Sequence, residues 1–283
     1  MSLATTKAIA LSGLNGEVIT VEVDIADGLP GYTLLGLPDT ALSESRDRVR
    51  AALVNSLQPW PNRKVTIALL PAWLPKAGSG FDLPIAMGLL GAQGVVQGVE
   101  ELLFVGELSL DGSLRQTRGV LPSLICAYRN GIRKAVIPKA NLAEAKLLPE
   151  LEVFAFDALK DVVHWMQTGE IAEQSEFDLE YGVIEKSLDF ADVAGQTAAR
   201  RAAEISAAGA HNFLMIGPPG VGKTMIAERM PTILPPLSKE ETLEVSAIHS
   251  ITNSDRTPLS TTAPFISPHH STTRIAMVGG GAH

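Results

Sequence analysis

The sequence lacks the features of secreted, membrane-spanning and strongly basic proteins. It has one cysteine, Cys126, so no disulfide can form within the chain and a reducing compartment is expected. Its longest apolar region, 85–96, is too short to cross a bilayer and is interrupted by glycines and Gln93. The first residues have neither a charged start nor a long apolar segment, so no signal peptide is expected. These absences predict a cytoplasmic protein that does not enter membranes.

Basic residues are too few for binding to duplex DNA through charge alone. The 283 residues include 23 Lys and Arg against 31 Asp and Glu, which gives a net charge of −8. Proteins that bind duplex DNA usually carry a clustered basic surplus. Any contact with DNA is therefore expected from local loops or from an assembled ring. The composition, with 46% hydrophobic and 19% charged residues, is that of a globular protein, and the length favours two domains.

A phosphate-binding loop is the clearest motif in the chain. Eight residues match the pattern G-x-x-x-x-G-K-[ST]: Gly217, Pro218, Pro219, Gly220, Val221, Gly222, Lys223 and Thr224. Its glycines permit backbone conformations in which successive N–H groups surround a phosphate, and Lys223 can reach the β and γ phosphates. Thr224 can offer its hydroxyl to Mg²⁺. A strand at 213–216 and a helix ending near Met230 complete the predicted site, and we predict ATP and Mg²⁺ as cofactors.

The residues before the loop show strand and helix patterns that predict a first domain at 1–168. Asp82, Asn141 and Asp157 are predicted to cap helices, and Asp111-Gly112 to turn a hairpin. Strands are predicted at 19–25, 32–35, 64–70, 104–110, 135–138 and 152–156. Helices are predicted at 39–55, 82–90 and 119–130, and two more are predicted to begin after residues 141 and 157.

An acidic linker at 169–187 is predicted to separate this domain from a second one at 188–283. Residues 170–185 include six acidic side chains and no basic one. The second domain is expected to hold one helix at 197–208, before the phosphate loop, and another at 239–248, after it.

Two further segments resemble those of a known family. The sequence D-V-A-G-Q at 192–196 resembles the first motif of AAA+ ATPases, in which Val193 and Gly195 would lie near the adenine. The sequences P-F-I-S-P-H-H-S at 264–271 and M-V-G-G-G at 277–281 resemble the magnesium-chelatase branch of those ATPases. Together with the first domain, the chain resembles the N-terminal part of the ComM/YifB family.

The resemblance implies a hexameric, ATP-driven DNA branch-migration helicase that takes part in natural transformation, and hence in competence and DNA recombination. It implies a homo-hexamer that could hold DNA through the assembled ring. Hydrolysis also needs a Walker B acidic strand, and AAA+ proteins carry sensor and arginine-finger residues; we find none of these after Thr224. We therefore expect a truncated member of a family whose proteins are ATPases and helicases. This chain is expected to bind ATP and not to hydrolyse it alone.

The first domain resembles the catalytic domain of Lon proteases, of the ribosomal-protein-S5 domain 2 type. The resemblance rests on G-E-L-S-L-D-G at 106–112 and P-K-A-G at 75–78. It implies an α/β fold in which a Lon-like α+β domain precedes an incomplete P-loop AAA+ α/β domain.

Lon enzymes use a serine activated by a lysine, and this sequence places Asp82 and Leu121 at the matching positions. Neither residue can do that chemistry, so the chain is predicted not to be a protease. A shifted dyad of Ser79 and Lys76 stays open as an alternative. A Lon-like ATP-dependent peptidase and a non-catalytic assembly module stay open as alternative functions.

The neighbouring histidines His269 and His270 allow two interpretations. They could bind a metal, or they could be loop residues at an interface or near the nucleotide. Adjacent side chains usually point in different directions, and no cysteine or carboxylate cluster stands at ligand spacing. The loop interpretation is favoured, and no metal ligand other than Thr224 is predicted.

Overall fold

The computed structural model describes residues 2–171, 188–252 and 261–279, which divide into two compact units. The first unit comprises Met1–Glu180 together with Ser246–Leu259, and the second comprises Tyr181–Val245 together with Ser260–His283. Most of the predicted linker, 172–187, lies outside the described residues. The predicted domain boundaries stay predictions.

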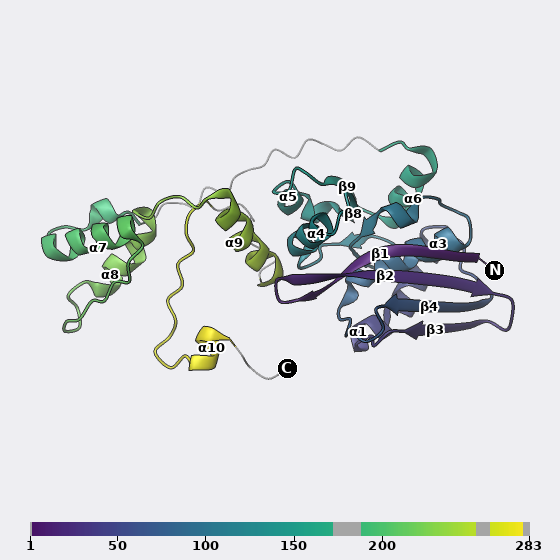
Figure 1. Ribbon diagram of the computed structural model, residues 1–283, viewed down its shortest axis with the longest axis horizontal. Coiled ribbons are helices and arrows are strands. Elements are labelled where there is room, and N and C mark those ends of the chain that lie inside the picture. Colours follow the sequence, from purple (N-terminus) through teal and green to yellow (C-terminus); the bar gives the residue numbers. More distant parts are fainter. Residues whose placement is uncertain (1, 172–187, 253–260, 280–283) are drawn as a thin grey trace. The chain divides into compact units, whose positions relative to one another are not determined.

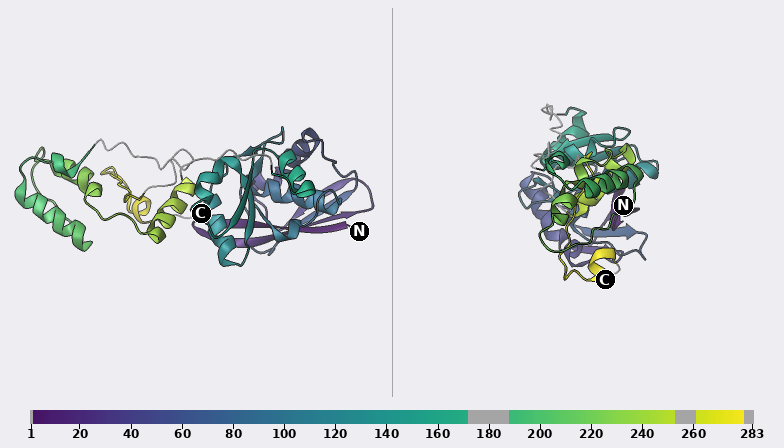
Figure 2. Two further views of the ribbon diagram at one scale, coloured as in Figure 1. Left: turned by 90° about the horizontal axis from the view of Figure 1, so that it is seen from above. Right: turned by 90° about the vertical axis from the view of Figure 1, so that its left-hand side faces the viewer.

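The first unit is built on a seven-stranded sheet in the order β3-β4-β2-β1-β5-β8-β9, with a separate two-stranded hairpin of β6 and β7 (Figure 1). Four of its six strand pairs are parallel, which confirms an α/β fold. The strands are β1 Ser2–Ser12, β2 Asn15–Ala26, β3 Gly31–Leu35, β4 Lys64–Leu70, β5 Leu103–Phe104, β6 Glu107–Leu108, β7 Leu114–Arg115, β8 Lys134–Pro138 and β9 Glu152–Phe156. The long β1–β2 hairpin is the purple pair in Figure 2.

Helices pack on both faces of this sheet because its strands alternate their side chains between two cores. On β8, Val136 joins one core, whereas Ala135 and Ile137 join the other. The first core is covered by helices α2, α3 and α6, and the second by α4 and α5. The helices of this unit are α1 Thr40–Ser43, α2 Ser45–Asn55, α3 Asp82–Ala92, α4 Val120–Arg129, α5 Leu142–Ala145 and α6 Leu159–Thr168.

Helix α3 is the central helix of the first core, and ten of its eleven residues are buried. It lies close to β2 because Gly88 has no side chain: a Cβ at this position would lie 2.7 Å from the Val23 Cγ2 atom. Each large apolar side chain buried here stabilises the fold by roughly 1.5–3 kcal/mol. This helix therefore fixes the position of the residues at its N-terminus, Asp82 among them.

The second unit has a small core around the predicted phosphate loop. Phe190, Val193, Ala203 and Ile226 form its buried centre. The helices are α7 Thr197–Gly209, α8 Lys223–Arg229 and α10 Arg274–Val278, and α9 Lys239–Thr252 begins in this unit. No helix in the described ranges is long and apolar enough to span a membrane.

The sequence predicted most elements of the first unit, but two of its three helix caps were wrong. Phe81 and not Asp82 occupies the cap position of α3, and Ala158 and not Asp157 that of α6. Asn141 occupies the cap position of α5, as predicted, but its side chain makes no capping bond. Strand β1 was not predicted.

The strand predicted at 213–216 is also wrong, because these residues form no strand among the described residues. Phe213 and Met215 pack inward, whereas Leu214 and Ile216 are 81% and 89% exposed.

Candidate functional site

The phosphate loop of the second unit has the backbone that its glycines were predicted to allow. Gly220 and Gly222 have φ of +83° and +88°, in the left-handed region that side chains disfavour. Gly222 precedes the first residue of α8, Lys223. Gly217 does not need a positive φ, but a Cβ there would lie 3.3 Å from the Val221 side chain. The loop is therefore compact and ends at its lysine.

The Lys223 ammonium group turns back over the loop. Its Nζ atom donates hydrogen bonds of 2.8 Å to the carbonyl oxygens of Gly217 and Pro218. These two carbonyl oxygens keep the ammonium group at the loop. The negatively charged oxygens of a bound triphosphate would lie at the same place. Exchanging two neutral acceptors for charged phosphate oxygens strengthens the bonds of the ammonium group. The Lys223 ammonium group is thus held at the loop.

Thr224 is exposed, and its hydroxyl has no hydrogen-bond partner among the described residues. A free hydroxyl next to the phosphate-binding lysine is the group that P-loop proteins use to bind Mg²⁺. In the same described ranges no group of three or more His, Cys, Asp or Glu side chains could hold a metal ion. Thr224 therefore fits Mg²⁺ only if phosphate oxygens and water complete its coordination.

The D-V-A-G-Q segment lies beside the phosphate loop. Val193 is fully buried in the small core, and Gly195 turns the chain with φ of +67°. Gln196 also has a positive φ, +51°, which is uncommon for a residue with a side chain. Its Nε2 atom donates a 2.9 Å hydrogen bond to the carbonyl oxygen of Val221. Gln196 therefore ties this segment to the loop, although we did not predict it as a site residue.

His269 and His270 are in ring contact, with their centroids 4.0 Å apart and their planes tilted by 42°. The Nδ1 atom of His269 lies 2.7 Å from the Ser271 hydroxyl oxygen. Neither histidine belongs to a metal-binding group of three or more ligands in the described chain.

In the first unit, the position matched to the Lon serine holds a buried ion pair. The Asp82 carboxylate accepts hydrogen bonds from the Arg48 Nε and Nη2 atoms at 2.8 and 2.9 Å, and from the Leu108 N–H at 3.3 Å. Arg48 also donates to the Ala41 carbonyl oxygen at 2.9 Å. Asp82 is completely buried, whereas the Arg48 side chain is 21% exposed.

The surroundings of Asp82 change its ionisation. Burial raises the pKa of Asp82 to about 6, and the opposing influence of Arg48 lowers it by less. The pair with Arg48 occupies both carboxylate oxygens, so Asp82 serves as an acceptor and not as a nucleophile. We did not predict Arg48, which lies 34 residues away in the sequence.

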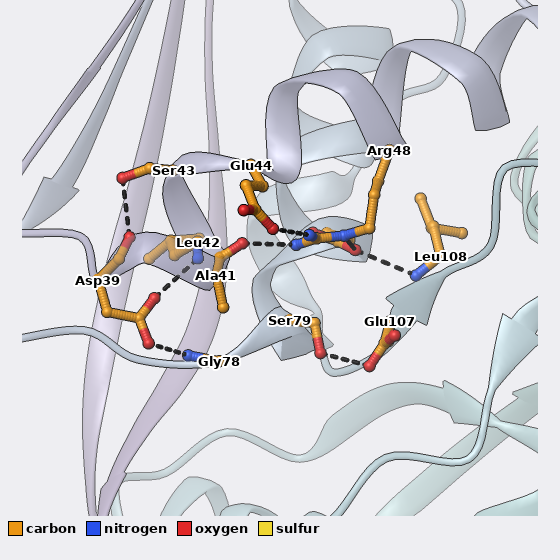
Figure 3. A network of polar contacts seen from close by, with 11 residues as sticks. Asp39, Ala41, Leu42, Ser43, Glu44, Arg48, Gly78, Ser79, Glu107 and Leu108 are labelled. Carbon is orange, nitrogen blue, oxygen red and sulfur yellow. Dashed lines mark hydrogen bonds and ion pairs between the residues drawn. The ribbon is translucent and has the colours of Figure 1, made fainter.

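The structure does not bring Ser79 and Lys76 together. Lys76 is buried, and its Nζ atom donates to the carbonyl oxygens of Leu69, at 2.9 Å, and of Pro71. Burial lowers the pKa of Lys76. The Ser79 hydroxyl instead donates to the Glu107 carboxylate (Figure 3). The two groups of the alternative dyad therefore have different partners.

The position matched to the Lon lysine, Leu121, is buried at the start of α4. Its backbone N–H donates to the buried Glu144 carboxylate at 3.3 Å. The Asn141 Nδ2 atom donates to the same carboxylate and to the Thr117 carbonyl oxygen. Its Oδ1 atom accepts from the Thr117 N–H at 3.0 Å, which explains why this oxygen makes no capping bond to α5. Burial raises the pKa of Glu144, which the sequence did not single out.

Two family models match the chain in succession. The description "Subunit ChlI of Mg-chelatase" matches residues 21–141, and "Magnesium chelatase, subunit ChlI" matches residues 189–283. The first covers most of the first unit, and the second covers the phosphate loop and both histidines.

Similar proteins match along the whole chain. An uncharacterized protein of Mycobacterium tuberculosis is 47% identical over 288 residues, which cover 100% of this chain and 57% of that protein. The uncharacterized protein YifB of Salmonella typhimurium is 45% identical over 285 residues, covering 100% and 56%. Competence protein ComM of Haemophilus influenzae is 38% identical over 293 residues, covering 99% and 56%. The chain thus spans little more than half the length of these relatives.

A more distant similarity covers about half of the chain. Lon protease of Mycolicibacterium smegmatis is 26% identical over 168 residues, which cover 55% of this chain and 21% of that protein. The similarity to YifB and ComM is much stronger and extends along the whole of this chain, and both family models agree with it. The chain therefore belongs to the magnesium-chelatase-like ComM/YifB family.

Proposed function

We propose that this protein is an AAA+ protein that binds ATP and Mg²⁺ through residues 217–224. The observation that carries the proposal is the placement of the Lys223 ammonium group over the carbonyl oxygens of its own loop, 2.8 Å from two of them. Lys223 would bind the β and γ phosphates, and Thr224 would bind Mg²⁺. Val193 and Gly195 would lie near the adenine.

At the length of its relatives, we propose that the protein forms a homo-hexamer that uses ATP to move branched DNA. Support comes from its 38% identity to a competence protein over 99% of the chain. Hydrolysis in P-loop motors requires acidic and arginine groups in addition to the loop. For residues 1–283 alone we propose nucleotide binding without turnover. A cytoplasmic location fits the single buried cysteine.

We propose that the first unit is a Lon-like scaffold without peptidase activity. The specific observation in favour of this assembly role is that the serine position holds an aspartate paired with Arg48, at 2.8 and 2.9 Å. A carboxylate held in this way cannot attack a peptide carbonyl as a serine hydroxyl does.

A DNA branch-migration assay tests the proposed motor. The protein at the full length of YifB and ComM is mixed with a labelled branched DNA, with and without ATP. We expect ATP-dependent movement of the branch that is lost in Lys223→Ala and retained in Lys239→Ala, which changes an exposed lysine outside the loop. Movement without ATP, or unchanged movement in Lys223→Ala, would contradict the proposal.

A further inference from the structure

Four arginines of the first unit, all near its edge strand β3 or on helix α2, differ in their partners. Arg48 pairs with Asp82, and Arg63 pairs with Asp27 at 3.4 Å. Arg46 and Arg50 instead lie over aromatic rings. The Arg46 Cζ atom is 5.7 Å from the Tyr32 ring centroid, and the Arg50 Cζ atom is 6.0 Å from that of Trp60. We call Tyr32, Arg46, Arg50 and Trp60 the arginine–aromatic cluster.

The two rings of the cluster support each other. Tyr32 and Trp60 stack with their centroids 6.2 Å apart and their planes 23° apart. Both rings are half-buried and pack against the first core, so their positions are fixed by the fold. The two arginines are exposed and stand one turn apart on α2. The cluster therefore presents two ordered guanidinium groups on an aromatic base.

The charges of Arg46 and Arg50 are not neutralised by a carboxylate. In the part of the chain that the structure describes, no Asp or Glu oxygen lies within ion-pair distance of either guanidinium group. The neighbouring Asp47 is exposed and pairs with neither. Like charges one turn apart destabilise a helix. Repulsion between Arg46 and Arg50 thus destabilises α2 slightly. An anionic ligand bound between them would remove this repulsion.

We propose that the arginine–aromatic cluster binds single-stranded nucleic acid. Guanidinium groups pair with phosphates, and guanidinium planes that lie over aromatic rings, as those of Arg46 and Arg50 do, can stack on unpaired bases. Duplex DNA is a poorer match, because its bases are already stacked and its binding needs a broad basic surface, whereas the chain has a net charge of −8. This inference rests on the proposed action on DNA and is independent of the phosphate loop.

Fluorescence anisotropy of a labelled oligothymidylate, titrated with the full chain at several salt concentrations, tests the proposal. For single strands the logarithm of affinity falls by about 0.7 per phosphate contact for each tenfold rise in salt. The double variant Arg46→Gln/Arg50→Gln is therefore expected to bind more weakly at low salt, with a salt slope that is smaller by about 1.4. Trp60→Leu removes the ring that lies under Arg50 and is expected to lose about fivefold in affinity, the value for one stacked base, because Arg50 is then no longer held in place to stack.

Two controls make the result specific. Arg63→Gln removes an arginine that already pairs with Asp27 and should bind like the wild type. A polyglutamate of the same length supplies charge without bases and should compete poorly. Equal affinity of the wild type and the double arginine variant, equal loss in Arg63→Gln, or full competition by polyglutamate would overturn the inference.

A separate readout distinguishes this inference from the proposed nucleotide site. Wild-type, Arg46→Gln/Arg50→Gln and Lys223→Ala proteins are each tested for ATP binding. DNA binding that survives the double variant overturns the cluster and leaves the nucleotide site intact. ATP binding that survives Lys223→Ala overturns the nucleotide site and leaves the cluster intact.

Discussion

Replacing Arg48 by methionine is expected to destabilise the first unit by about 3 kcal/mol at pH 7, because it leaves the Asp82 carboxylate buried without a cation. Removing one partner of a buried pair usually costs roughly 3–5 kcal/mol. We expect the lower limit, because Asp82 can take up a proton instead of staying charged. The bond from Arg48 to the Ala41 carbonyl oxygen, 2.9 Å long, is lost as well.

The cost of Arg48→Met is expected to fall as the pH is lowered. The pKa of Asp82 is about 6 in the wild type, against 3.8 for an unperturbed aspartate, so the folded state binds the proton first. This preference stabilises the fold fully below pH 3.8 and is lost as the pH rises through 6. Without Arg48 the pKa of Asp82 rises further. At pH 7, one unit above the wild-type pKa, the wild type has Asp82 ionised while the variant keeps it protonated. The loss of unfolding free energy caused by Arg48→Met is therefore about 1.4 kcal/mol larger at pH 7 than near pH 5.

Urea unfolding followed by tryptophan fluorescence measures this directly, because Trp60, Trp73 and Trp165 all lie in the first unit. The double variant Arg48→Met/Asp82→Leu removes both charges and should recover most of the lost stability. An Arg48→Met protein within about 0.5 kcal/mol of the wild type, the range of ordinary surface changes, would refute the reasoning. So would a cost that is the same at pH 5 and pH 7, or a double variant as unstable as the single one.

Three further changes have defined outcomes. Gly88→Ala places a Cβ 2.7 Å from the buried Val23 side chain and should lower the unfolding free energy in the same fluorescence assay, by about 1–2 kcal/mol, while Ala92→Gly should not cause a clash. Thr224→Ala should leave ATP affinity equal in Mg²⁺ and in EDTA, and a persistent Mg²⁺ effect would move the metal ligand elsewhere. Gln196→Ala removes the bond to the Val221 carbonyl oxygen and should weaken ATP binding about fivefold, whereas unchanged affinity in a titration would show that this bond does not order the loop.

The sequence predicted features whose cause is local. Strand β2 alternates buried and partly exposed residues along its length, so its period was readable from residue types alone. The phosphate loop was readable because its two left-handed positions, Gly220 and Gly222, favour glycine.

Features that depend on distant partners could not be read in this way. Asp82 has the residue type of a helix cap, but a partner 34 residues away takes its carboxylate. Asn141 likewise bonds to Thr117, 24 residues away. The segment 213–216 has the apolar run of a strand, and whether it becomes one depends on a neighbouring strand.

Nucleotide binding by Lys223 is the central claim, and calorimetry tests it most directly. The full chain is titrated with a slowly hydrolysed ATP analogue in the presence of Mg²⁺, alongside Lys223→Ala and the exposed control Lys239→Ala. We expect saturable heat at one site per chain in the wild type and the control, and none in a Lys223→Ala protein whose circular dichroism is unchanged. Binding of the analogue by Lys223→Ala with the affinity of the wild type would contradict the account.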